Sequence, residues 1–174
     1  GQIRNEKPLE LPADLRWIGE WSGFVQERRG PMKYDVWVLD LLIKGQVPMT
    51  VGKDNYLREA NIAHLYAPGT CYYEGPSETH VKSYYMMFDN VLAGSLDRLI
   101  GGLGYARISD PEGFLGDLFS RMLDSYETTD SRLTYRIQGL FLMIIDLLLG
   151  ARQIGEHSYL VSSQGSISPF VSAV

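Results

Sequence analysis

Two kinds of side chain with chemical potential occur together in "HLYAPGTCYYEGPSETHVKSYYMMF", residues 64–88. His64 and His80 carry imidazoles, which are common metal ligands. The tyrosines of the same segment offer flat apolar faces with one hydroxyl each, which suits the binding of a small polar or amphipathic molecule. The segment therefore raises a choice between metal chemistry and ligand recognition, and the spacing of its residues must decide it.

A metal site in a β-barrel needs two or three imidazoles and a carboxylate projecting inward from neighbouring strands. Here His64 and His80 are each the single histidine of an expected strand, and no His-x-His pair occurs. A site could be assembled from these two histidines with Glu74 and Glu78, but nothing in their spacing indicates it. We predict no metal site and no cofactor.

Other catalytic patterns are missing as well. The sequence has no Gly-x-Ser-x-Gly elbow and no phosphate-binding loop, and "GGLGYARI" follows an expected helix instead of a strand. The lone Cys71 has no partner for an intramolecular disulfide, and we expect it to be a small buried apolar residue. We therefore predict that this chain is not an enzyme.

The tyrosines favour a binding pocket. Strand alternation over residues 80–88 predicts one uncharged face, the better candidate for a closed barrel interior, and Ser83 and Tyr85 would be its polar groups. Tyr73, Trp17, Trp37 and Arg29 are the other residues expected to line the pocket. Asp40 interrupts the apolar face of an earlier strand, and a place at the edge of the packed area is expected for it ahead of the alternative, a ligand-facing role.

These side chains must be positioned by a β-rich region. From Leu15 to Phe88, turn residues separate short runs rich in β-branched and aromatic residues, which is typical of a sandwich or barrel: "DVWVLDLLI", "VPMTV", "IAHLY" and "HVKSYYMMF". Helical spacing follows in "VLAGSLDRLIGG", "PEGFLGDLFSRMLDSYE" and "TTDSRLTYRIQGLFLMIIDLLLGAR". The sequence thus predicts an α+β fold, a β-barrel followed by a helical pair.

The last of these helices is apolar around most of its circumference, so it needs more than one partner surface. One reading is a homodimer, with the contact on Leu140, Ile144, Leu147 and Leu148. The other is that the preceding helix covers this surface within the same chain. The sequence leaves both readings open.

Composition limits the partners. The chain has 174 residues and a net charge of −5, which gives no broad cationic surface for nucleic acid. Its longest apolar run, "LFLMIIDLLLG", is shorter than the roughly 20 residues of a membrane span, and no secretory signal is evident. We expect a cytoplasmic protein that has no membrane contact.

The order of several segments is similar to a known family. An Arg-containing turn, "ERRGPMKYD", precedes a strand ending in "IKGQ"; then come "NIAHLYAPGTCYYEG", an aromatic strand and two helices. From Leu15 to Arg152 this resembles the N-terminal sensor and dimerization domain of AraC-type transcription regulators, a cupin-like double-stranded β-helix (jelly-roll) barrel followed by a helical pair. The resemblance implies an N-terminal arm (1–14), a barrel (15–90), a helical dimerization segment (91–153) and a tail (154–174).

The resemblance also implies partners. The barrel would bind a small metabolite, a sugar being one candidate, and the helices would form a homodimer. DNA would be bound only through a separate C-terminal domain with two helix-turn-helix units, expected beyond Val174. The arm could be a lid or be disordered. A small cupin enzyme, a metal-dependent isomerase or oxygenase, is the alternative, and a purely structural dimer module is a third reading.

Carried over by position, the resemblance places Arg29 at a ligand-contacting arginine near the barrel mouth, with Arg28 one residue away as the other choice. Tyr73 corresponds to an aromatic position after the Pro-Gly turn, and Ser83 and Tyr85 to two inward positions on the last strand. Arabinose-binding members carry His and Trp at these last two positions, which argues against arabinose as the ligand.

Overall fold

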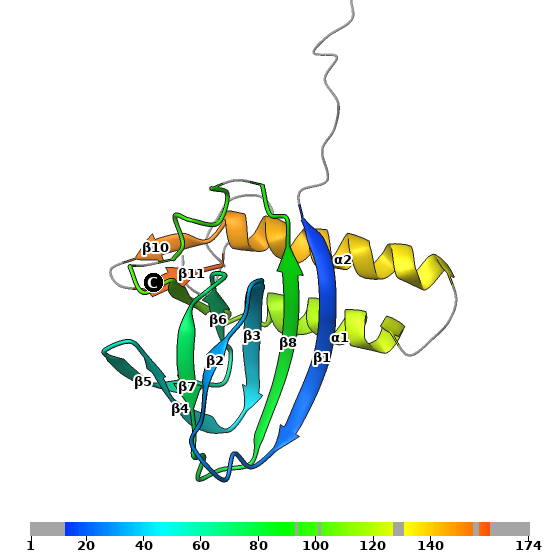
Figure 1. Ribbon diagram of the computed structural model, residues 1–174. Helices are drawn as coiled ribbons and strands as arrows, with labels where there is room; N and C mark the ends of the chain where they lie inside the picture. Colours follow the sequence, from blue (N-terminus) through cyan, green and yellow to red (C-terminus); the bar gives the residue numbers. More distant parts are fainter. Residues whose placement is uncertain (1–12, 93, 101, 127–130, 155–156, 161–174) are drawn as a thin grey trace, which may run out of the picture.

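The computed structural model describes residues 13–92, 94–100, 102–126, 131–154 and 157–160. Two β-sheets face each other, and two helices cover the outer side of the larger sheet (Figure 1). The elements are, in chain order, β1 (Asp14–Gly23), β2 (Arg29–Lys33), β3 (Trp37–Lys44), β4 (Gln46–Val51), β5 (Asp54–Glu59), β6 (Ile62–Tyr66), β7 (Cys71–Glu74), β8 (Val81–Asp89), β9 (Tyr105–Ser109), α1 (Phe114–Tyr126), α2 (Ser131–Leu149), β10 (Arg152–Ile154) and β11 (His157–Tyr159).

The strand order explains how the barrel closes. The larger sheet has the order β1-β8-β3-β6-β9-β11-β10 and the smaller sheet β2-β7-β4-β5. Every pairing is antiparallel except that of β9 with β11. Between β1 and β8 the chain passes repeatedly from one sheet to the other, so the two sheets enclose an interior between them. The chain has a β-rich, cupin-like fold, as the sequence predicted in outline.

Strand β3 is apolar on both faces because each face packs against a different layer. Leu39 and Leu41 belong to the core shared with the helices, whereas Val38 and Leu42 belong to the core between the two sheets. Because side chains alternate along a strand, the two sets point to opposite sides of the larger sheet. Both faces of this strand are therefore covered, one by the helices and the other by the smaller sheet.

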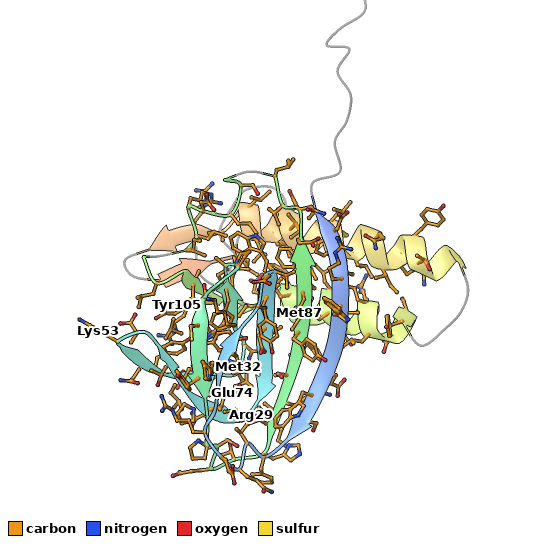
Figure 2. The ribbon with its side chains drawn as sticks, in the orientation of Figure 1. Arg29, Met32, Lys53, Glu74, Met87 and Tyr105 are labelled. Carbon is orange, nitrogen blue, oxygen red and sulfur yellow. The ribbon has the colours of Figure 1, made fainter. Side chains whose placement is uncertain are left out.

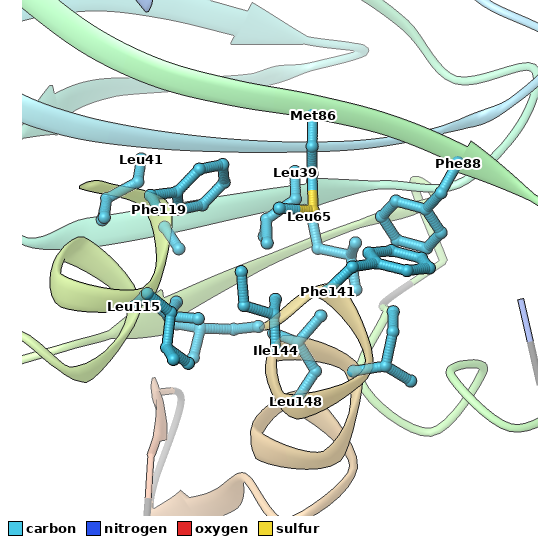
Figure 3. Packing of buried hydrophobic residues seen from close by; sticks show 14 of the residues in the cluster. Leu39, Leu41, Leu65, Met86, Phe88, Leu115, Phe119, Phe141, Ile144 and Leu148 are labelled. Atoms are coloured by element: carbon cyan, nitrogen blue, oxygen red, sulfur yellow. The ribbon is translucent and has the colours of Figure 1, made fainter. Parts of the chain in front are cut away.

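The core between the larger sheet and the helices is built from large aliphatic and aromatic side chains. Figure 3 shows side chains of β3, β6 and β8 meeting those of α1 and α2: Leu39, Leu41, Leu65, Met86, Phe88, Leu115, Phe119, Phe141, Ile144 and Leu148. Fully burying one such side chain contributes about 1.5 to 3 kcal/mol, so this layer fixes the helices to the barrel.

Helix α1 starts later than expected. The expected helical segment starts at Pro111, but Gly113 has a φ of +74° and the helix begins at Phe114. The Asp110 carboxylate accepts hydrogen bonds from the backbone N–H groups of Leu115 (3.0 Å) and Gly116 (3.3 Å), which satisfies donors of the first helical turn.

The segment 91–102 was predicted to be a short helix, and that prediction is wrong. Its described residues form turns, with hydrogen bonds from Ser95 N to Leu92 O and from Leu99 N to Leu96 O. Gly94 has a φ of +74°, which a right-handed helix does not accommodate. The turns bring Arg98 to the end of α2, where its guanidinium donates to the carbonyl oxygens of Leu149 and Ala151.

The expected segment limits also change. Strand β9 lies beyond the expected barrel limit at residue 90 but pairs with β6, so it is part of the larger sheet. Strand β11 lies within the expected tail, yet it pairs with β9. Both strands were missed because they are short and adjoin helical patterns. Most of the expected arm and most of the tail fall outside the described residues.

The residues predicted to form a dimer contact lie in the core of the chain itself. Leu140, Ile144 and Leu148 are buried within the chain itself, and Leu147 is half-buried against the same core. The larger sheet and α1 cover these residues, because the side of α2 that carries them faces both. The assignment of Leu140, Ile144 and Leu148 to a subunit contact is therefore corrected, and the dimer itself stays a prediction.

We expect Ile144→Ala and Leu148→Ala each to lower the free energy of unfolding by about 2 to 5 kcal/mol, because each leaves a cavity in the core. Asp124→Ala on the exposed side of α1 is the control, with an effect within about 0.5 kcal/mol. Urea unfolding followed by circular dichroism measures all three. Equal small effects would contradict the described packing.

Candidate functional site

A cavity of about 250 Å³ lies between the two sheets. The uncharged face of β8 lines it, in agreement with the alternation pattern of that strand: Val81, Ser83, Tyr85 and Met87. The other lining residues come mainly from the facing strands and the turns between them: Trp21, Val25, Arg29, Met32, Tyr34, Val38, Asp40, Val47, Arg58, Tyr72 and Glu74. In Figure 2, Arg29, Glu74 and Met32 lie on β2 and β7, and Met87 lies on β8.

Four charged side chains on the cavity wall form one chain of ion pairs. The Arg58 guanidinium pairs with the Asp40 carboxylate, and its second terminal nitrogen lies 3.7 Å from Glu74 Oε2. Glu74 Oε1 in turn accepts from Arg29 at 2.5 Å. The Arg58 side chain is only 3% exposed, whereas that of Arg29 is 45% exposed. The network thus runs from the barrel interior to its mouth, and its formal charges cancel.

Burial sets the energetics of this network. Loss of solvent raises the pKa of Asp40 and of Glu74, while the neighbouring arginines oppose that rise. Burial acts to lower the pKa of Arg58, but the adjacent groups, Asp40 foremost, raise it overall, so Arg58 stays charged. Removing one partner of such a buried pair costs about 3 to 5 kcal/mol, against at most about 1 kcal/mol for an exposed pair.

Aromatic rings complete the walls. The Arg29 guanidinium carbon lies 5.0 Å from the centre of the Trp21 ring, a cation–π contact at the mouth. Tyr85 lies opposite Gly19 in the pairing of β8 with β1. A Cβ atom at position 19 would lie 2.4 Å from the Tyr85 hydroxyl oxygen, so only glycine leaves room for this ring.

The structure brings three of the expected site residues to the cavity: Arg29, Ser83 and Tyr85. Tyr73 does not line the cavity, because strand alternation points it away while Tyr72 and Glu74 point inward. The Arg28 guanidinium carbon lies 4.1 Å from the centre of the Tyr73 ring. Arg28 is therefore outside the cavity with Tyr73, whereas Arg29 lines it. The placement of Tyr73 in the pocket is thus one residue out of register.

The two expected tryptophans lie outside the cavity as well. Trp37 stacks on Phe88 on the helix side of the larger sheet, with ring centres 6.4 Å apart. Trp17 is 61% exposed and borders a separate groove. Trp21, two residues further along β1, is the tryptophan that lines the cavity. The register of β1 contains an irregularity between Leu15 and Trp17, which the sequence does not reveal.

Sequence reasoning missed the charged half of the site. Asp40 was expected at the edge of the packed area, but it lines the cavity between Val38 and Leu42 on the inward side of β3. Arg58 was not singled out at all, since a single arginine in a short polar strand gives no pattern. The available signal was Asp40 itself, a carboxylate in an apolar strand, which requires a buried cation to pair with it.

The histidines occupy two unrelated environments. His64 is fully buried, and its Nδ1 lies 3.3 Å from the Tyr56 hydroxyl. Burial and the nearby charges of Arg58 and Arg107 lower its pKa well below the usual 6.5, so the ring is neutral. His80 is exposed, with its ring 5.5 Å from that of Phe24.

Within the described part of the chain, no group of three or more His, Cys, Asp or Glu side chains is placed to hold a metal ion. Cys71 is exposed, so the expectation of a buried apolar cysteine is wrong. It is the first residue of β7 and alternates with Tyr72, which takes the inward direction.

His64 predicts a pH dependence of stability. Below about pH 6.5 the unfolded chain takes up a proton at this residue and the folded chain does not, so the free energy of unfolding falls as the pH is lowered. The slope approaches about 1.4 kcal/mol per pH unit for one proton. We expect His64→Gln to flatten the slope between pH 6.5 and 5. An NMR titration of the His64 ring near pH 6.5 would contradict this assignment.

Comparison with known proteins gives likeness in structure alone. No family model matches the sequence, and no curated protein matches it. ToxT from Vibrio cholerae O395, bound to (E)-4-(8-methylnaphthalen-1-yl)but-3-enoic acid, is similar with a TM-score of 0.50 at 6% identity, covering 76% of this chain and 57% of that one.

Two further solved structures show weaker likeness. Unsaturated fatty acid-bound ToxT from Vibrio cholerae strain SCE256 has a TM-score of 0.48 at 11% identity and covers 80% of this chain and 55% of that one. YhaK from Escherichia coli has a TM-score of 0.45 at 17% identity and covers 64% and 48%. The chain thus spans about half the length of these proteins. Neither described helix is long and apolar enough to cross a membrane.

Proposed function

We propose that this chain is the effector-sensing and dimerization domain of an AraC-type transcription regulator, with a small metabolite bound in the barrel cavity. The observation that carries the proposal is the preformed cavity, whose charges pair with one another and whose walls hold several aromatic rings. The fold likeness to ToxT, which holds a small carboxylic acid in the matched structure, supports it. DNA would be bound by a separate C-terminal domain.

The lining fits recognition better than catalysis. Arg58, Asp40 and Glu74 are engaged with one another, so the cavity offers no strong acid or base free to exchange a proton. The same groups, with Ser83 and Tyr85, can align a polar molecule between apolar walls. A sugar is one such molecule. The effector would act by favouring one arrangement of barrel and helices over another.

The alternative is a small cupin enzyme that uses the same barrel with a metal ion. His64 would be the natural imidazole ligand, but it is buried beside Tyr56 and does not line the cavity. Elemental analysis of the purified full-length protein separates the two functions. One equivalent of iron, manganese, nickel or zinc would overturn the sensor proposal.

For the dimer, we propose an outer face of α2. Tyr135, Leu142 and Leu149 recur at seven-residue spacing along one side of that helix. Tyr135 is 80% exposed and Leu149 is exposed, while Leu142 is half-buried; Met143 beside them is also exposed. A row of exposed apolar residues on a helix marks a protein contact more often than a solvated surface.

The ligand prediction uses pairs of neighbouring residues. A metabolite that binds the cavity at 100 times its dissociation constant should stabilise the protein by about 2.7 kcal/mol, seen as a rise in Tm during screening against sugars and small organic acids. Tyr85→Ala and Arg29→Ala should abolish that rise. Tyr73→Ala and Arg28→Ala, just outside the cavity, should retain it. An unchanged response in the first pair would place the ligand elsewhere.

The dimer prediction uses surface residues only. Tyr135→Glu combined with Met143→Glu should convert a dimer into a folded monomer, because both changes place charge on the proposed contact and neither disturbs the core. Light scattering after size-exclusion chromatography measures the mass, and circular dichroism verifies folding. A wild-type monomer at micromolar concentration, or a double variant that stays dimeric, contradicts the proposed face.

A further inference from the structure

The charged cavity adjoins a second, apolar hollow. A groove of about 520 Å³ is lined by Trp17, Ile18, Tyr34, Asp35, Val36, Tyr85 and Met87. Three of these residues, Tyr34, Tyr85 and Met87, line the cavity too. The two hollows therefore share three lining side chains.

The two hollows differ in chemistry. The cavity contains all four members of the ion-pair network, whereas Asp35, exposed at the surface, is the only charged residue of the groove lining. Trp17 is 61% exposed beside the groove and offers it a large apolar ring. A polar compartment thus continues into an apolar one.

Strand β8 gives the direction and length of the combined site. Val81 and Ser83 line the cavity alone, and Tyr85 and Met87 line both hollows. With about 3.3 Å per residue, the path from Val81 to Met87 is roughly 20 Å long. In the pairing of β1 with β8, Trp17 lies opposite Met87 and Trp21 opposite Ser83. Trp17 therefore lies at the groove end of the path, and Trp21 lies within the cavity, four residues away along β1.

The charge balance restricts the polar end of a ligand. Arg29 and Arg58 already have Glu74 and Asp40 as partners, so an added anion would have to displace a carboxylate inside the barrel. A displaced, buried carboxylate without a partner is costly. An uncharged hydroxylated group, or one carrying both charges, can hydrogen-bond to the same residues without breaking their pairs.

We propose that the cavity and the groove together bind one amphipathic molecule. Its uncharged or zwitterionic head lies among Arg29, Glu74 and Ser83, and its hydrocarbon or aryl tail passes Tyr85 to reach Trp17. This inference rests on the proposed function and specifies the ligand class of the same site. Tyr85 is the residue at the junction, held by its packing over Gly19.

The first test compares three probes by isothermal titration calorimetry: monooctanoylglycerol, glycerol and octanoate. Each buried CH₂ group contributes roughly fourfold to affinity, so burial of even two or three of them should make the tailed ester bind about tenfold to a hundredfold more tightly than glycerol. Octanoate, with a similar tail and an anionic head, should bind at least about tenfold more weakly than the ester. Equal binding of ester and glycerol overturns the tail site, and equal binding of ester and octanoate overturns the neutral head.

The second test reads the direction of the ligand. An ester with bromine at the end of its tail should quench the fluorescence of Trp17 more strongly than that of Trp21, because Trp21 lies four residues, or roughly 13 Å, from Trp17 along β1. Trp17→Phe should remove most of the quenching, and Trp21→Phe should retain it. The reverse pattern overturns the proposed orientation.

A third variant tests the groove without touching the cavity. Trp17→Ala should reduce the affinity for the ester toward that for glycerol, since this exposed ring lines the groove and does not line the charged cavity. Tyr73→Ala is the control and should leave both affinities unchanged. If small polar metabolites raise the Tm but tails add nothing, the amphipathic ligand is wrong and the sensor stands. If no small molecule binds, both proposals fail.

Discussion

The pairing of Arg58 with Asp40 and Glu74 is the constraint on which the barrel interior depends. Arg58 extends from β5 of the smaller sheet, Asp40 from β3 of the larger sheet and Glu74 from β7. Burying any of these charges without a partner would cost several kcal/mol, so the three strands must pack in the one register that brings the charges together. The network also determines which molecules can bind in the cavity, because a ligand must not leave any of these charges unpaired.

The apolar framework was largely predictable because it follows repeating patterns. Two-residue alternation placed Val81, Ser83, Tyr85 and Met87 on one inward face, and helical spacing found α1 and α2. Both signals arise because many apolar residues recur at a regular spacing. Elements with few residues gave no such signal: β9 and β11 were missed, and the turns around Gly94 were taken for a helix.

The candidate site was predicted less well because it depends on single residues and on register. Arg29, Ser83 and Tyr85 line the cavity, whereas Tyr73 misses it by one position. A one-residue error turns a strand side chain to the opposite face, so neighbours in sequence exchange roles completely. Arg58 could not be placed, because its importance comes from partners on β3 and β7 that lie far from it in sequence.

Strand β11 has a mechanical consequence. It follows α2 and hydrogen-bonds in parallel to β9, which in turn pairs with β6 in the wall of the barrel. Arg98 ties the end of α2 to the turns before β9. The helical layer is thus joined to the barrel beyond its last turn as well as across its buried face. A displacement of β6 or β9 would therefore act on α2 at its C-terminal end and along its packed side at the same time.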